Sequence, residues 1–337
     1  MTQPELKEYL KSLGAPAFRG AQVFEWIYKG KTDFRDITVL PEVLREKLAE
    51  NAAIGTLKTL VVQKSRTDGT RKYLFELADG NTIESVFMKY KFGNSICVSS
   101  QAGCRMGCAF CASTRNGLAR DLTAGEIVSQ ILEAEADTGE RIGHIVIMGS
   151  GEPFDNYENV SRFLRIVNDP KGLNIGMRNI TVSTCGLVPM IPRFAEDFGQ
   201  VNLAISLHAP NDEIRSSMMP VNRKWGIREL IEACRDYAEK TGRRVTFEYT
   251  LVSGVNDSDA HAAELAALLR GLLCHVNLIP LNKVSETGLD TVPRARAEEF
   301  RQLLEKRGIP ATVRRELGAD IDAACGQLRL NAARKKA

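Results

Sequence analysis

The sequence lacks the apolar segments that carry a chain into or across a membrane. Residues 1–7 contain no apolar core of a secretory signal. No stretch approaches the roughly 18 uninterrupted apolar residues that a transmembrane helix needs. Internal repeats and low-complexity tracts are also missing, which leaves an ordinary globular chain. We therefore expect a cytoplasmic protein that has no membrane partner.

The sequence also has few histidines and a small net charge. The four histidines stand apart at positions 144, 208, 261 and 275, so they form no pair of the kind found in zinc fingers. The net charge is only +3, which is compatible with nucleic-acid binding but does not indicate it. Cysteine is plentiful by contrast, with eight residues. Because cytosolic thiols stay reduced, some of these cysteines call for a metal-binding or catalytic explanation.

The first ninety residues predict a small helical unit followed by β-structure. Leu6, Tyr9, Leu10 and Leu13 repeat with helical spacing. Further helical patterns follow to about residue 48, and apolar strand patterns then occupy 57–62, 73–77 and 82–88. Asp79-Gly80 is a strong hairpin signal between the last two runs. We predict that residues 1–90 form a helical accessory domain with a β-hairpin extension.

From about residue 93 strand and helix patterns alternate. The expected strands are 95–99, 144–148, 179–183, 201–207, 246–252, 275–280 and a short 311–315. The expected helices are 124–138, 159–167, 227–241, 258–272 and 295–307. Repeated β/α units imply a parallel sheet with outer helices, and six units are too few to close an eight-stranded barrel. We predict an α/β fold in which residues 91–318 form a partial (β/α)6 barrel and 319–337 a C-terminal loop with a basic tail.

Cys104, Cys108 and Cys111 follow the first barrel strand with the spacing C-x3-C-x2-C. The C-terminal ends of such strands are where β/α sheets place active sites. A four-iron cluster is normally held by four thiolates, so three would leave one iron open to a small molecule. A zinc knuckle would need a second ligand pair, which is missing here. The triplet therefore predicts an open [4Fe-4S] cluster.

This triplet, placed after the first strand of a partial barrel, resembles the radical S-adenosylmethionine (SAM) superfamily. Residues 148–153, which contain Gly151 and Glu152, resemble the superfamily element that contacts the amino group of SAM. The resemblance implies two cofactors, a [4Fe-4S] cluster and SAM. In that superfamily the open iron binds SAM, and an electron from the cluster cleaves it to a 5′-deoxyadenosyl radical.

A closer resemblance covers nearly the whole chain. Segments 96–101, 148–153, 205–213, 276–280 and 320–328 are similar to the radical-SAM RNA adenine-C2 methyltransferases of the RlmN type. The resemblance implies methylation of adenosine C2 in 23S rRNA and tRNA. It also implies an electron donor such as flavodoxin or ferredoxin, and we expect a monomer. The N-terminal unit would grip RNA, and Lys89, Lys91, Arg314, Arg315 and the basic tail could steer it.

The resemblance also implies the catalytic residues. Cys325 would be the methyl carrier, methylated by one SAM and activated by a second, and its carbon would add to adenine C2. Cys97 would release the product and leave a Cys97–Cys325 disulfide, and Glu84 would take the C2 proton. From the residues alone, Cys97 could also be a small buried strand residue, and Glu84 a solvent-facing carboxylate of the hairpin.

SAM contacts carry over by the same resemblance. They fall on Gly151, Glu152, Ser183, Ser206, Leu207, His208 and Asn282. His208 could instead be a hydrogen-bonded structural histidine. Cys185 and Ser150 depart from the common family pattern, and we assign Cys185 no role. Cys234 and Cys274 are most simply core thiols.

Other functions remain open at this level. A sister family that methylates adenine C8 shares the triplet, the two further cysteines and the barrel. We favour C2 because 187–189 and 313–318 look more like that group. A protein-modifying radical-SAM activase would not need Cys325, and an iron–sulfur redox sensor would not cleave SAM.

Overall fold

The computed structural model of the chain describes residues 1–55, 57–281 and 288–321. Its described strands form a ten-stranded sheet in the order β1-β2-β3-β4-β7-β8-β9-β10-β11-β12. The first four, β1 (Lys58–Lys64), β2 (Arg71–Glu76), β3 (Thr82–Tyr90) and β4 (Gly93–Val98), pair with one another antiparallel. The predicted hairpin through Asp79-Gly80 is confirmed as the connection between β2 and β3.

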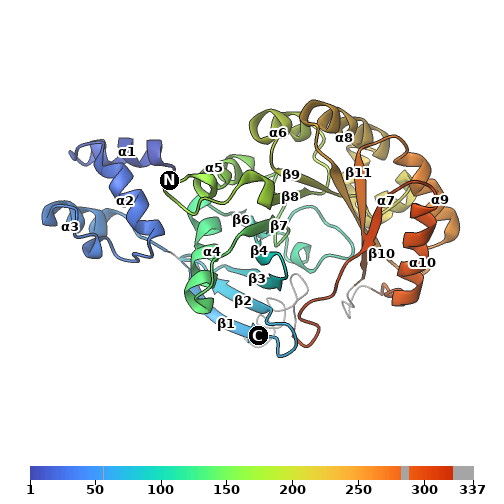
Figure 1. Cartoon of the computed structure of the whole chain (residues 1–337), viewed down its shortest axis with the longest axis horizontal. Coiled ribbons are helices and arrows are strands. Elements are labelled where there is room, and N and C mark those ends of the chain that lie inside the picture. Colours follow the sequence, from blue (N-terminus) through green and yellow to red (C-terminus); the bar gives the residue numbers. More distant parts are fainter. Residues whose placement is uncertain (56, 282–287, 322–337) are drawn as a thin grey trace.

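From β4 onward the sheet is parallel. The strands that follow are β7 (His144–Ile147), β8 (Ile180–Thr184), β9 (Asn202–Ser206), β10 (Val245–Leu251), β11 (Cys274–Pro280) and β12 (Ala311–Val313). The strand order is linear from β1 to β12, so the curved sheet stays open, as Figure 1 shows. The predicted α/β fold with a partial barrel is confirmed. A separate small sheet pairs β5 (Gln101–Gly103) with β6 (Leu118–Asp121) around the cysteine triplet.

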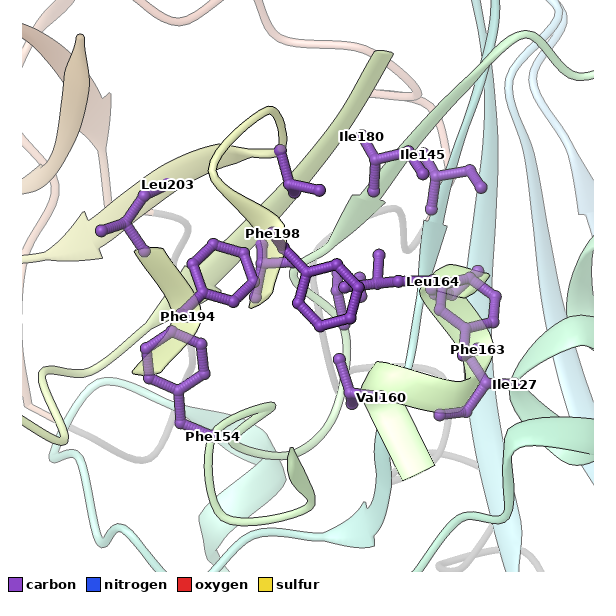
Figure 2. Close-up of a cluster of buried hydrophobic side chains, with 14 of the residues drawn as sticks. Ile127, Ile145, Phe154, Val160, Phe163, Leu164, Ile180, Phe194, Phe198 and Leu203 are labelled. Atoms are coloured by element: carbon purple, nitrogen blue, oxygen red, sulfur yellow. The ribbon is translucent and has the colours of Figure 1, made fainter. Parts of the chain in front are cut away.

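Helices cover the outer face of the parallel strands. They are α4 (Ala124–Thr138), α5 (Tyr157–Asn168), α6 (Met190–Phe198), α8 (Ile227–Thr241), α9 (Asp259–Leu268) and α10 (Arg294–Glu305). The short helix α7 (Asp212–Met218) contacts the cysteine loop instead, where the carbonyl of Met218 accepts from the amide of Ala109 at 2.9 Å. Helix α4 begins with a capping box between Thr123 and Glu126 and ends at Gly139 in the left-handed conformation. Figure 2 shows the core that results, in which Phe163 and Leu164 of α5 pack beside Ile127. The packing of these helices on the sheet holds the strands in place, and with them the polar residues at the strand ends.

The N-terminal helices α1 (Gln3–Ser12), α2 (Arg19–Tyr28) and α3 (Glu42–Asn51) gather at one end of the molecule, beside α5 (Figure 1). Helices α1 and α2 cross closely at Gly20, where a Cβ atom would lie 2.8 Å from the backbone nitrogen of Lys7. The Gln3 side chain donates to the carboxylate of Asp169, just after α5, at 2.9 Å. Among the described helices none is both long and apolar enough to cross a membrane.

Candidate functional site

One cavity of about 760 Å³ opens at the C-terminal ends of β7 to β11. It gathers nine of the residues predicted for the site: Cys97, Cys104, Cys108, Cys111, Gly151, Glu152, Ser183, Ser206 and His208. Leu207 is fully buried beside it. Glu84 is also buried, and it lies next to the lining rather than in it. Asn282 and Cys325 lie outside the described residues.

The loop that carries the three cysteines is closed at its base by backbone contacts. The amide of Cys104 donates to the carbonyl of Gly117 at 3.0 Å. Gly103 has a φ of +88°, and a Cβ atom there would lie 2.1 Å from the same Gly117 oxygen, so no other residue fits. Within the loop, the Cys111 amide donates to the Cys108 carbonyl at 3.1 Å. The three thiols are thus held on one short, folded-back segment.

Electrostatics at this loop suit a positively charged partner. Burial raises the pKa of the Cys104 thiol to about 12, and the neighbouring Cys111 and Glu152 add to the rise. Burial, followed by the charges of Cys111 and Cys104, also raises the pKa of Cys108. Thiolates so close together need iron or another cation to balance their charge. Three clustered sulfur donors therefore fit an iron–sulfur cluster.

In the described parts of the chain, no group of three His, Cys, Asp or Glu side chains converges on a point that could hold a metal ion. This is expected of the thiols of a four-iron cluster, because each binds a different iron. The arrangement differs in this way from the tetrahedral convergence of a zinc site. Cys97 and Cys185 are further buried cysteines in the cavity lining.

Glu152 is held rigidly where the chain leaves β7. Its carboxylate accepts hydrogen bonds from the amides of Phe154, at 3.0 Å, and Cys185, at 2.7 Å. Burial raises the pKa of this carboxyl, and the two amides oppose that rise. Gly151 has a φ of +109°, and a Cβ atom there would lie 2.6 Å from Gln101, so the turn requires glycine. The carboxylate retains acceptor capacity towards the cavity for an ammonium group.

His208 is hydrogen-bonded within the fold, and its role as a SAM contact stays a prediction. Its Nδ1 accepts from the amide of Thr250 at 2.9 Å, which places the proton on Nε2. Burial, aided by the charge of Arg215, lowers its pKa to about 3, so the ring is neutral at physiological pH. The backbone φ of +57° is rare for a residue with a side chain. The ring packs edge-on against Phe110 of the cysteine loop and lines the cavity.

Arg215 is a site residue that sequence reasoning missed. Its fully buried guanidinium donates to the carbonyls of Cys185, at 2.7 Å, and Leu207 and Ser206, both at 3.1 Å. It thereby links the C-terminal ends of β8 and β9, beside the cavity. A single arginine in a short polar helix carries no sequence signal for this role. Glu248, a buried carboxylate in the cavity lining, was also missed, although its position inside an apolar strand was a usable signal.

Cys97 and Glu84 lie on the same face of the sheet. Cys97 of β4 pairs with Val86 of β3, and Glu84 stands two residues earlier on β3. The Glu84 carboxylate forms an ion pair with Lys72 of β2 at 3.1 Å, with side-chain exposures of 6% and 0%. The interpretation of Glu84 as a solvent-facing carboxylate is therefore wrong. Cys97 is buried and also lines the cavity, and its role in product release stays a prediction.

Residues 314–319 and Ile321 also line the cavity. Leu317 packs against Val86, Met88 and Cys97. The amide of Gly318 donates to Asp68, in the turn between β1 and β2, at 2.7 Å. In return, Asp320 accepts from the hydroxyl of Ser65, at 2.6 Å, and the amide of Arg66, at 2.8 Å. We call these reciprocal contacts between residues 65–70 and 317–320 the carboxylate latch.

Comparison with known proteins gives a consistent result. A model of the radical SAM superfamily matches residues 98–266, and one of the ribosomal RNA large subunit methyltransferase N-terminal domain matches residues 1–54. A probable dual-specificity RNA methyltransferase RlmN of Geobacillus kaustophilus is 56% identical over 333 residues, covering 98% of this chain and 91% of that protein. A protein of the same name from Desulforamulus reducens is 53% identical, covering 98% of this chain and 94% of its own length. The crystal structure of a radical SAM methyltransferase from Sphaerobacter thermophilus matches with a TM-score of 0.93 and 50% identity, over 97% of both chains.

Proposed function

Because this chain belongs to the RlmN family of radical-SAM RNA methyltransferases, we propose that it methylates C2 of adenosine in 23S rRNA and tRNA. One observation carries the proposal. A single cavity brings together the three-cysteine loop, the anchored Glu152 and the thiol of Cys97. The names of the relatives favour neither the C8-methylating sister family nor a protein-modifying activase.

The cofactors are a [4Fe-4S] cluster and SAM, which when bound supply a methyl group from one SAM and a 5′-deoxyadenosyl radical from a second. Cys104, Cys108 and Cys111 would hold the iron. Glu152 would accept from the amino group of SAM, and Gly151 lets the backbone approach it. Ser183, Ser206, Leu207 and His208 surround the same space and complete the binding site, together with Asn282 beyond the described residues.

The chemistry on the protein runs between two sulfurs and one carboxylate. Cys325 carries the methyl group, and its activated carbon bonds to adenine C2. Glu84 takes the proton that leaves C2 as the adduct radical gives up one electron, which the oxidised cluster would accept. The Cys97 thiolate then attacks the Cys325 sulfur, the carbon–sulfur bond breaks, and the departing carbon takes up a proton to become the methyl group, which leaves a Cys97–Cys325 disulfide. Ile321, four positions before Cys325 in the sequence, lines the cavity.

We propose a division of labour along the chain. Residues 1–90 bind RNA, 91–318 hold the cofactors, and 319–337 present Cys325 and a basic tail. Each turnover consumes electrons at the cluster and at the disulfide, so a reductant such as flavodoxin or ferredoxin is required. We place the enzyme in the cytoplasm, acting as a monomer.

The test is Cys97→Ala, assayed anaerobically with reconstituted cluster, SAM and RNA. We expect a covalent protein–RNA adduct to accumulate, because the Cys325 sulfur is no longer attacked. The adduct should be missing from Cys97→Ala/Cys325→Ala and from Cys104→Ala. Mass spectrometry of the nuclease-digested wild-type product should give 2-methyladenosine. The proposal fails if RNA stays free while 5′-deoxyadenosine forms, or if 8-methyladenosine is the product.

A further inference from the structure

An exposed aromatic side chain stands at the edge of the cavity. Strands β3 and β4 are joined by a two-residue turn, Lys91-Phe92, between the paired residues Tyr90 and Gly93. Phe92 is 67% exposed. Its ring stacks on that of Tyr90, with centroids 4.8 Å apart and planes 9° from parallel. We call this pair the Tyr90–Phe92 platform.

The platform is held in place from behind. Tyr90 lines the cavity, and its hydroxyl contacts the Met88 sulfur at 3.7 Å. Tyr90 also packs on the cluster that contains Cys97. The rings of Phe92 and His144 pack edge-to-face, with their centroids 5.0 Å apart and their planes at 77°. Because these contacts already order the side chains of Tyr90 and Phe92, the two side chains lose little conformational freedom when a ligand covers Phe92.

Positive charge accompanies the aromatic surface. Lys91 is exposed beside Phe92 and has no salt bridge to any described residue, whereas the neighbouring Lys89 is paired with Glu140. Arg314 and Arg315 are exposed as well, and both line the cavity. An aromatic face among cations is the combination by which proteins hold unpaired nucleotides, with the base stacked and the phosphate neutralised.

We propose that the Tyr90–Phe92 platform stacks an unpaired base of the substrate RNA, next to the adenine that enters the cavity, while Lys91 contacts the adjoining phosphate. An adenine that leaves its stack exposes the face of its neighbour. Phe92 covers that face and keeps the RNA open. The inference rests on the proposed RNA substrate but not on which carbon is methylated.

The test measures binding of a fluorescent RNA stem-loop with an unpaired adenosine in its loop to the reconstituted full-length enzyme. Phe92→Ala should raise the dissociation constant roughly tenfold, as loss of one stacked base does. Phe92→Trp should restore binding, and Lys91→Ala should weaken it and lower its salt dependence. Leu273→Ala, at an exposed apolar residue just before β11 and outside residues 1–90, serves as the matched control.

A second RNA, abasic at one nucleotide beside the adenosine, sharpens the test. When the missing base is the one that stacks on Phe92, wild-type enzyme should bind the abasic RNA more weakly than the intact RNA. Phe92→Ala should bind the two RNAs equally, because in a double-mutant cycle a direct contact is lost only once. We expect this result for at least one of the two positions that neighbour the adenosine. The proposal would be overturned if Phe92→Ala and the wild type bound RNA with equal affinity. It would also be overturned if the only defect of Phe92→Ala were slower reduction of the enzyme by flavodoxin. RNA binding through the platform without 2-methyladenosine formation would instead count against the proposed function alone.

Discussion

Lys72 and Arg215 are cations whose side chains have no measurable exposure to solvent, and the two are neutralised in different ways. Arg215 is surrounded by backbone carbonyls and the side-chain oxygen of Asn222. Lys72 is paired with the carboxylate of Glu84. Removing one partner of a buried ion pair leaves an uncompensated charge, whereas replacing both with apolar groups costs little.

Lys72→Met should therefore lower the free energy of unfolding by about 3–5 kcal/mol. Lys72→Met/Glu84→Met should recover most of that loss but remain unable to release methylated RNA, because Glu84 is the proposed base. Urea unfolding and the yield of methylated RNA measure the two effects separately. Lys240→Met, which breaks an exposed pair with Glu196, is the control and should change stability by less than about 1 kcal/mol. A double variant that still turns over would remove Glu84 from the mechanism.

Residues with a chemical signature in the sequence were predictable, and residues defined by their surroundings were not. The spacing of Cys104, Cys108 and Cys111 and the glycine-rich turn before Glu152 are visible in the chain itself. The role of Arg215 depends on the Cys185 carbonyl, thirty positions away, and that of Lys72 on strand pairing with β3. Only the folded chain brings these groups together.

At the level of elements, the carboxylate latch connects a hairpin turn to the segment that leads to Cys325. Hydrogen bonds to the Asp68 carboxylate from Gly318 and Thr70 outweigh its partial burial and lower its pKa to about 2. A lowered carboxyl pKa stabilises the structure above the ordinary value near 3.8, and that contribution fades as pH falls towards 2. The latch is therefore fully formed at neutral pH.

Asp68→Ala and Asp320→Ala should each loosen residues 317–321. Loss of one to three hydrogen bonds, each contributing about 1 kcal/mol, predicts amide exchange there roughly five- to a hundredfold faster. Methylation of Cys325 should become slower, while the affinity for SAM at the site around Glu152 should not change. Hydrogen-exchange mass spectrometry and intact-protein mass measure these effects, with the exposed Glu50→Ala as control. Unchanged exchange in both variants would show that the latch does not order this segment.

Periodicity located the long elements and missed the short ones. The predicted run 144–148 corresponds to β7, and 227–241 matches α8 to the residue. Strands β5 and β6 were not predicted, because three and four residues are too few for a pattern and their pairing includes an irregular register. Helix α7, of seven residues, was missed for the same reason. Helix α6, of nine residues, was not predicted either.

For the whole molecule, the N-terminal helices contact the barrel in part through polar groups. Glu5 pairs with Arg162 and Gln3 with Asp169, both across to the α5 region. Removal of residues 1–54 should leave a folded protein that cleaves SAM but binds RNA at least tenfold more weakly. Circular dichroism, 5′-deoxyadenosine formation and RNA affinity measure the three properties. Undiminished RNA affinity would show that these helices do not bind substrate.

The continuity of the ten-stranded sheet sets where such a truncation can be made. A cut at residue 90 falls in the β3–β4 turn and would strip β4 of its antiparallel neighbour. Its exposed amides and carbonyls would then be a template for strands of other molecules, which is how open sheet edges seed aggregation. The β-extension thus covers the edge of β4, and a cut ahead of β1 leaves that edge paired.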